Sequence, residues 1–274
     1  MLNLKIKNIK SSSYNALDVI TGAVMAYSIY KLYSAATKCV RVRRSSDDTE
    51  ADIGFSGNYI DIVALNAHLG ASNGYVTKWY NQYSGGNDAV QATKIKQPKI
   101  SKTTGEIFFD NPIYSDGPLH LSINTYAASD IGGSPISFYA NIMPLGARGH
   151  IVARPNTTAN STSYGIYRFI DNKIYFTLDT VSYTFTPTFF TVLNNEYSKI
   201  LLSHNGTTVS SNKGIGILTQ NDTDTTYAIP NGYMLIGANV LDGGTGYYFY
   251  GYMKTVIMFS QDKRNDYSKL ASKC

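Results

Sequence analysis

The chain has 274 residues, of which 43% are hydrophobic and 16% charged. This composition excludes a highly charged disordered protein and allows one large β-sandwich domain. The net charge is +5, yet Arg41, Arg43 and Arg44 form the only tight basic cluster. A nucleic-acid-binding surface needs a longer basic stripe, so we expect no nucleic-acid partner. No run approaches about 18 apolar residues, so we also expect no membrane insertion.

The cysteines and the start of the chain indicate where the protein is made. Cys39 and Cys274 are the only cysteines, too few for a disulfide framework and without the spacing of a zinc site. The residues after Met1–Lys5 are polar, where a secretion signal needs a continuous apolar core. We therefore expect synthesis in a cytoplasm that keeps thiols reduced.

Residues 1–16 are predicted to form an N-terminal arm, and residues 17–274 the folded domain. Leu2, Leu4 and Ile6 alternate along the arm and would lie on one side of an extended chain. Such an edge favours strand addition to a neighbouring subunit, as in a homo-oligomer. The alternative is a disordered tail.

Two short helices are expected near the start of the domain. Spaced apolar residues predict the first at residues 23–36, although Gly22 just before them weakens that stretch. The second lies within residues 60–69, with Asp61 as its cap and Gly70 as its stop.

Beyond residue 74 the pattern changes to strands separated by Gly, Asn, Asp, Ser or Pro. The expected strands are residues 75–80, 106–109, 136–143, 150–154, 164–170, 173–178, 197–203, 234–238 and 248–259. Many strands joined by short turns indicate an all-β sandwich.

Two stretches resemble known families. The first resembles the N-terminal half of the arabinofuranosidase B catalytic domain, a pattern that also recurs in phage and prophage virion proteins. Its ordered motifs are Ala26–Ser28, Arg41–Phe55, Val76–Gln82 and Gly86–Ala89. Met234–Asn239 and Tyr248–Phe259 resemble the closing hairpin of concanavalin A-like and laminin G-like domains. The resemblance implies a jelly-roll sandwich of two antiparallel sheets.

The resemblance does not carry over the family's catalytic pair. Its nucleophile is a Glu that follows two adjacent cysteines, whereas this chain has no such pair and no glutamate between Glu106 and Glu196. Asp242 is the nearest counterpart of the acid/base Asp. Because a glycosidase needs two carboxyl groups, we expect a domain that is not an enzyme.

The sequence gives little indication of a metal-binding site. The four histidines, His68, His120, His150 and His204, are scattered, so no metal site is expected. Asn221–Asp224 resembles the start of a calcium loop without its later Gly and Glu, which leaves calcium as the one cofactor kept open. Charged residues close in sequence predict a structural ion-pair cluster of Arg43, Arg44, Asp47, Glu50 and Asp52.

Glycan recognition combines aromatic faces with amide or carboxylate groups, and the chain holds 23 tyrosines. Two stretches supply that mixture. The candidates are Trp79, Tyr80, Asn81, Gln82, Asn87 and Asp88 in the first, and Asp242, Tyr247 and Tyr248 in the second. The competing interpretation makes Trp79 a core anchor and Asn87–Asp88 a turn.

Taken with the resemblance, these features predict a bacteriophage virion protein of the tail, fibre or capsid decoration, made in the cytoplasm of a bacterial host. Its lectin-like domain is expected to contact host-surface carbohydrate or neighbouring virion subunits, with the arm binding other virion proteins. The alternatives are a glycoside hydrolase or depolymerase that acts on host polysaccharide through Asp242, and a purely architectural role.

Overall fold

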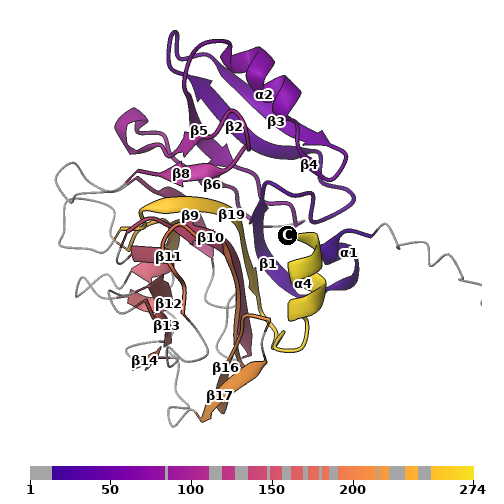
Figure 1. Ribbon diagram of the computed structural model, residues 1–274, viewed down its shortest axis with the longest axis vertical. Helices are drawn as coiled ribbons and strands as arrows, with labels where there is room; N and C mark the ends of the chain where they lie inside the picture. The colour runs from indigo at the N-terminus through magenta and orange to yellow at the C-terminus, as the bar shows by residue number, and fades with distance from the viewer. Residues whose placement is uncertain are drawn as a thin grey trace, which may run out of the picture.

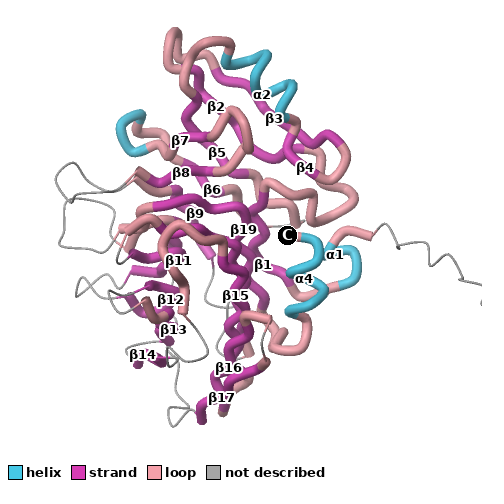
Figure 2. Tube along the Cα trace, in the orientation of Figure 1, coloured by secondary structure: helices cyan, strands magenta, loops and turns pink. Residues whose placement is uncertain are grey.

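The computed structural model describes residues 14–83, 86–110, 119–126, 135–146, 149–155, 162–168, 172–178, 181–184, 191–214, 216–221, 232–239 and 248–274. Two layers of antiparallel strands face each other, and a further group of strands joins them at one end (Figures 1 and 2). The expected all-β jelly-roll sandwich with short N-terminal helices is confirmed.

Six of the described strands form the first layer. In spatial order they are β17 (Ile217–Asn221), β16 (Thr208–Asn212), β15 (Ser198–His204), β10 (Ile136–Pro144), β19 (Gly251–Phe259) and β1 (Ala23–Ser28). Helices α1 (Ala16–Val19) and α4 (Tyr267–Lys273) lie side by side against its outer face (Figure 1). Buried Ala16, Leu17, Ile20 and Leu270 pack there against Tyr139 and Phe259.

Within the part of the chain that the structure describes, seven strands form the second layer. In spatial order they are β14 (Val181–Thr184), β13 (Ile174–Leu178), β12 (Thr162–Arg168), β11 (Gly149–Pro155), β18 (Gly232–Ile236), β9 (Leu121–Tyr126) and β6 (Ala89–Val90). The main core fills the space between the layers, where the rings of Phe138 in β10 and Phe176 in β13 meet edge to face at 5.7 Å. Burial of this interior apolar surface is the principal source of stability.

The remaining strands form an upper group that connects the layers. In spatial order they are β4 (Tyr59–Ile60), β3 (Glu50–Ser56), β2 (Lys38–Arg44), β5 (Gly74–Trp79), β7 (Lys99–Ile100) and β8 (Ile107–Phe109). β5 also pairs with β6 of the second layer, and β8 pairs with β19 of the first. Helix α2 (Ile62–Leu69) and the short 3-10 helix η1 (Lys94–Lys96) complete this group.

The prediction of a helix at residues 23–36 is wrong. Residues 23–28 form β1, whose Tyr27 lies opposite Val256 of β19. Met25 and Tyr27 are buried in the main core, whereas Ala23 and Ala26 are buried under α1 and α4. A strand buried on both faces has a near-continuous apolar sequence, which periodicity cannot distinguish from a buried helix.

The second expected helix is confirmed as α2. The Asp61 side chain accepts a hydrogen bond from the Ala64 amide at 2.9 Å, and Gly70 ends the helix with a φ of 55°. This is the capping chemistry that the sequence indicates. Each of the expected strands overlaps an observed one.

Residues 14–16 of the expected arm pack with the domain, because Ala16 is completely buried. The rest of the arm, residues 1–13, lies outside the described residues. In the described part of the chain, no helix is long and apolar enough to cross a membrane.

Candidate functional site

An open pocket of about 280 Å³ lies where the β1–β2 loop meets the β5–β6 loop. Its lining is rich in tyrosine, and we call it the tyrosine pocket. The lining residues are Tyr33, Ala35, Ala36, Thr37, Lys38, Tyr80, Asn81, Gln82 and Tyr83. Its volume is close to the lower limit of small-molecule sites, which is adequate for a sugar unit.

Gln82 joins the two loops from a buried position. Its side-chain oxygen accepts from the Leu32 amide at 2.7 Å, and its Nε2 donates to the carbonyls of Ser28 at 2.7 Å and Tyr30 at 2.9 Å. The Gln82 amide is thus fully used by the backbone. Its role is to hold the pocket wall rather than to contact a ligand.

Asn81 fixes the next turn of the same loop. Its Oδ1 accepts from the amides of Ala26 at 3.0 Å and Tyr83 at 3.1 Å, and its own backbone amide donates to Asp88 at 3.0 Å. These bonds hold the β5–β6 loop against β1. The rings that line the pocket are therefore carried by a rigid loop.

Three tyrosine rings supply the apolar surface of the pocket. Tyr33 and Tyr83 lie 6.3 Å apart at an angle of 53°, and both are partly exposed. The ammonium groups of Lys38 and Lys78 each lie 5.2 Å from the centre of the Tyr80 ring. Aromatic faces beside ammonium donors suit a ligand with both C–H surfaces and hydroxyl groups.

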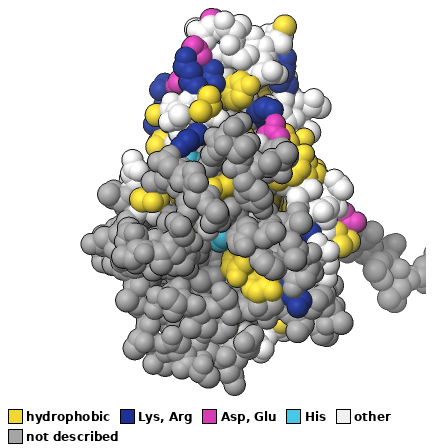
Figure 3. All heavy atoms as spheres, turned by 90° about the vertical axis from the view of Figure 1, so that its left-hand side faces the viewer, with side chains coloured by type: hydrophobic (Ala, Val, Ile, Leu, Met, Phe, Trp, Pro, Cys, Tyr) yellow, Lys and Arg dark blue, Asp and Glu magenta, His cyan; other side chains and the backbone are white. Residues whose placement is uncertain are grey.

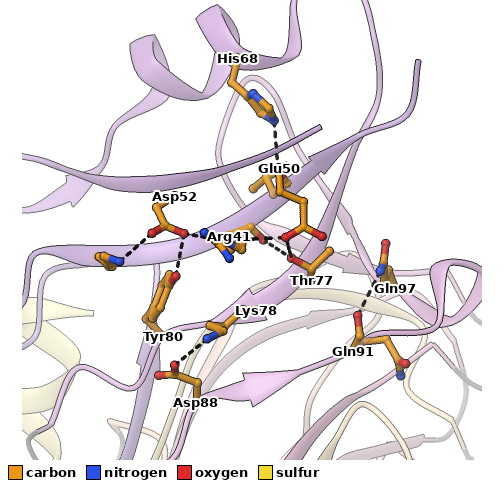
Figure 4. Close-up of polar contacts among 12 residues, drawn as sticks. Arg41, Glu50, Asp52, His68, Thr77, Lys78, Tyr80, Asp88, Gln91 and Gln97 are labelled. Atoms are coloured by element: carbon orange, nitrogen blue, oxygen red, sulfur yellow. Dashed lines mark hydrogen bonds and ion pairs between the residues drawn. The ribbon is translucent and has the colours of Figure 1, made fainter. Parts of the chain in front are cut away.

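Asp52 positions the Tyr80 ring (Figure 4). Tyr80 donates its hydroxyl to Asp52 at 2.6 Å, and Asp52 also binds Lys38 at 2.7 Å and Arg41 at 2.8 Å. Burial alone would raise the pKa of Asp52, but the hydrogen bonds from these three residues outweigh it and lower the pKa to about 2. Burial and the bond to Asp52 raise the pKa of Tyr80. The carboxylate stays ionised and the phenol stays protonated at neutral pH.

The residues of the expected ion-pair cluster form several separate pairs. Arg44 binds Asp47 through two nitrogens, at 2.9 and 2.6 Å. Arg43 pairs with Asp48 at 2.8 Å, a partner that the sequence did not indicate. Glu50 and Asp52 lie on either side of Arg41 Nε, at 3.8 and 2.8 Å (Figure 4).

The proposed sugar contacts at Trp79 and Tyr248 are wrong. Trp79 is completely buried and lies 5.9 Å from the Tyr27 ring, because β5 turns this side chain into the main core. Tyr248 is only 4% exposed and packs with Leu235 and Ala238. The alternative of Trp79 as a core anchor is correct.

The other candidates are in different positions. Tyr80 and Asn81 line the pocket. Asp88 pairs with Lys78 at 3.3 Å, and exposed Asn87 donates its side-chain amide to the Asn124 carbonyl at 2.7 Å. Neither residue lines the pocket, and the Asp88 carboxylate also accepts a hydrogen bond from the Asn81 amide of the same loop. Asp242 and Tyr247 lie outside the described residues.

Sequence reasoning missed Tyr33, Lys38 and Tyr83. Tyr83 directly follows the candidate stretch and could have been included. Tyr33 was hidden because its segment was interpreted as a helix, whereas residues 29–37 form the loop between β1 and β2. Among the described residues, no group of three or more His, Cys, Asp or Glu side chains is arranged to hold a metal ion.

No protein-family profile matches the sequence, and no curated protein matches it either. The fold does match solved structures. A GH54 α-L-arabinofuranosidase variant soaked with 4-nitrophenyl α-L-arabinofuranoside has a TM-score of 0.63 at 13% identity, over 90% of this chain and 61% of that one. An arabinofuranosidase complexed with arabinofuranosyl-α-1,2-xylobiose gives 0.62 at 13% identity, with the same coverage.

A Trypanosoma rangeli sialidase is a more distant match, with a TM-score of 0.51 at 8% identity over 71% of this chain and 30% of that one. The chain spans about 61% of the length of the arabinofuranosidases that it matches. At these identities the similarity concerns the fold. The chain is therefore an all-β jelly-roll domain similar in fold to arabinofuranosidase β-sandwiches.

Proposed function

We propose that this domain binds carbohydrate at the tyrosine pocket without cleaving it. The observation that carries the proposal is the pocket itself, where the rings of Tyr33, Tyr80 and Tyr83 surround a sugar-sized space beside the Lys38 ammonium. The structures with a similar fold are named as carbohydrate-active proteins, which supports the same ligand class.

The charges beside the pocket favour binding over cleavage. A glycosidase needs one carboxyl group that stays protonated until it donates its proton to the leaving oxygen. Asp52, the carboxylate that borders the pocket, has a pKa of about 2 and accepts three hydrogen bonds. Such a group holds Tyr80 in place and is a poor proton donor. The absence of the family's Cys-Cys-Glu pattern from the sequence supports the same conclusion.

The wider setting that we propose is a bacteriophage particle, in which the domain contacts host-surface glycan. Support comes from the resemblance of Arg41–Phe55 and Val76–Gln82 to virion proteins. In that setting the domain is a component of a tail, fibre or capsid decoration, present in several copies. Weak binding at each pocket would then add up through multivalency.

A glycan array followed by calorimetry tests the proposal. Wild-type protein should bind a defined set of glycans, and Tyr33→Ala and Tyr83→Ala should each weaken that binding at least about tenfold, as loss of a central aromatic contact does. Tyr14→Ala is the control, because Tyr14 is partly exposed, contacts Lys273 and is not among the residues that line the pocket. Unchanged binding by both pocket variants would contradict the proposal.

A second candidate function is hydrolysis of host polysaccharide. The observation that favours it is the match of 90% of this chain to an arabinofuranosidase fold. Release of reducing sugar from arabinan, xylan or host polysaccharide would show it. Loss of that release in Asp242→Asn, with the fold intact, would establish catalysis and overturn the non-enzymatic assignment.

A further inference from the structure

A row of cationic and aromatic residues crosses the outer face of the upper group and continues onto β19. Its members lie directly opposite one another on successive strands, one from each of β2, β5, β7, β8 and β19. They are Arg43, Tyr75, Lys99, Phe108 and Tyr252, and we call them the cross-strand row. With neighbouring strands about 4.8 Å apart, the row extends about 19 Å.

Neighbours in the row are in contact. The Arg43 guanidinium lies 4.8 Å from the centre of the Tyr75 ring, and the Lys99 ammonium 6.0 Å from that of Phe108. Phe108 and Tyr252 stack at 4.6 Å with 24° between their planes. Tyr250 adds a fourth ring, 5.9 Å from Phe108. The result is a preformed platform of ordered aromatic rings.

The platform is partly open to solvent. Tyr75, Phe108, Tyr250 and Tyr252 are all partly exposed, in contrast to Ile107 and Phe109, which point from the other face of β8 into the core. The Lys99 side chain is 43% exposed, whereas Arg43, at the other end of the row, is buried with its side chain only 9% exposed. In Figure 3, basic side chains lie among hydrophobic ones over the upper part of the molecule, where β2, β3 and β5 are placed.

Each cation of this surface has an acidic partner. Arg43 pairs at 2.8 Å with Asp48, which also binds Lys94 at 2.5 Å, and Lys99 pairs with Asp110 at 2.6 Å. Beside the row, Lys254 pairs with Glu106 at 3.0 Å. The surface therefore offers both donors and acceptors and has little net charge.

The platform lies on the same face as residues at the edge of the tyrosine pocket. Asp52 binds Lys38 of the pocket and also Arg41. Arg41 and Arg43 are two residues apart on β2, so their side chains leave the strand on one side. The row and the Arg41–Asp52–Lys38 contacts at the pocket edge therefore share one side of β2.

We infer that the cross-strand row is a second carbohydrate-binding surface, which takes the interior of an extended, uncharged polysaccharide chain. The inference goes beyond the tyrosine pocket, because the row would confer preference for long chains over short ones. It rests on the proposed function only in taking the ligand to be a glycan.

The paired charges of the cross-strand row favour one class of ligand over the others. A polyanion would gain little, since the cations are already neutralised by carboxylates that would repel it. An apolar protein surface would bury the ion pairs at a cost in desolvation. An uncharged sugar chain avoids both costs, because its hydroxyls hydrogen-bond to paired donors and acceptors while its C–H faces pack on the rings.

Affinity gel electrophoresis tests the inference with soluble arabinan, arabinoxylan, dextran and mannan as uncharged probes, and hyaluronan and polygalacturonate as acidic ones. Calorimetry with disaccharides to octasaccharides of any retained glycan then measures chain-length dependence. The test variants are Tyr75→Ala and Tyr252→Ala, with Tyr14→Ala as the matched control and Tyr33→Ala as the pocket variant. Circular dichroism and melting temperature show which variants fold, and Tyr252→Leu replaces Tyr252→Ala if the latter does not.

The wild-type chain should be retained by an uncharged polysaccharide and bind octasaccharides at least about tenfold more tightly than disaccharides. Variants of the row should lose that advantage while binding disaccharides normally, whereas Tyr33→Ala should weaken both. If the row variants keep the wild-type preference for octasaccharides, the inference is wrong, whereas the proposed binding at the tyrosine pocket still stands. If glycan binding is lost in the row variants but not in Tyr33→Ala, the proposal that the tyrosine pocket binds carbohydrate is wrong instead. Retention on acidic probes alone would refute an uncharged ligand, and retention on none would refute both proposals.

Discussion

At the scale of single residues, Asp52 links stability to acid pH. Its pKa is about 2 in the folded chain, against about 3.9 in an unfolded one. A lowered carboxyl pKa stabilises the fold above the unfolded value, and this contribution is lost as pH falls from about 4 towards about 2. The side chain is 25% exposed, so we expect about 1 to 2 kcal/mol after allowance for solvent screening.

Asp52→Asn should therefore reduce the free energy of unfolding at pH 6. The difference in this free energy between the variant and the wild type should become smaller as the pH approaches about 2. Urea denaturation, monitored by fluorescence, measures the free energy of unfolding at each pH. Asp61→Asn serves as control, because its capping bond to the Ala64 amide survives as an amide oxygen acceptor. A wild-type and Asp52→Asn difference that stays constant with pH would contradict the assignment.

His204 provides a second acid-sensitive group. It is 1% exposed at the end of β15; burial, reinforced by Arg264, lowers its pKa to about 4. An unfolded histidine binds a proton below about 6.5, so stability should fall as pH decreases from about 6.5 to about 4. His204→Gln should flatten the pH dependence of the melting temperature in that window. An unchanged slope in the variant would show that the pKa of His204 is the same in the folded and unfolded chain.

At the scale of elements, the pocket depends on how two loops are joined. Gln82→Ala would leave the Leu32 amide and the carbonyls of Ser28 and Tyr30 without this partner in a buried place. Loss of buried hydrogen bonds of this kind should cost about 2 to 4 kcal/mol. Chemical denaturation measures the loss, and Asn87→Ala, which removes an exposed side-chain amide that donates to the Asn124 carbonyl, should change stability by less than about 1 kcal/mol. Equal effects of the two substitutions would contradict the joining role of Gln82.

Local sequence patterns predicted elements well where one face is buried and the ends carry capping residues. α2 has both an Asp61 cap and a Gly70 stop, and each was recognisable in the sequence. β1 was misread because α1 and α4 cover the outer face of the first layer, so the strand has no polar side. That cover comes from the two ends of the chain, a tertiary arrangement that a local pattern does not contain.

At the scale of the whole molecule, the candidate site could be predicted only in part. Residues 80–82 were found from their composition, but residues 33–38 reach the pocket through a loop whose position depends on β1 pairing with β19. Trp79 illustrates the same limit, since alternation along β5 is broken by a register shift opposite Arg41 and Val42. An exposed aromatic and a core aromatic are therefore indistinguishable in that stretch until the strand's partners are known.

The division between arm and domain can be tested at the same scale. Residues 14–20 belong to the packed domain, because Ala16, Leu17 and Ile20 are buried against Leu270 and Tyr139. Removal of residues 2–13 should leave the melting temperature unchanged, whereas removal of residues 2–20 should lower it markedly through loss of these apolar contacts. We propose that the shorter deletion also abolishes incorporation into particles, because strand addition by Leu2, Leu4 and Ile6 to a neighbouring subunit would be lost. Calorimetry of the two deletions, together with quantification of each in purified particles, separates the effects. Normal incorporation of the shorter deletion would exclude the tether, and a lowered melting temperature would assign the arm to the domain's own sheet.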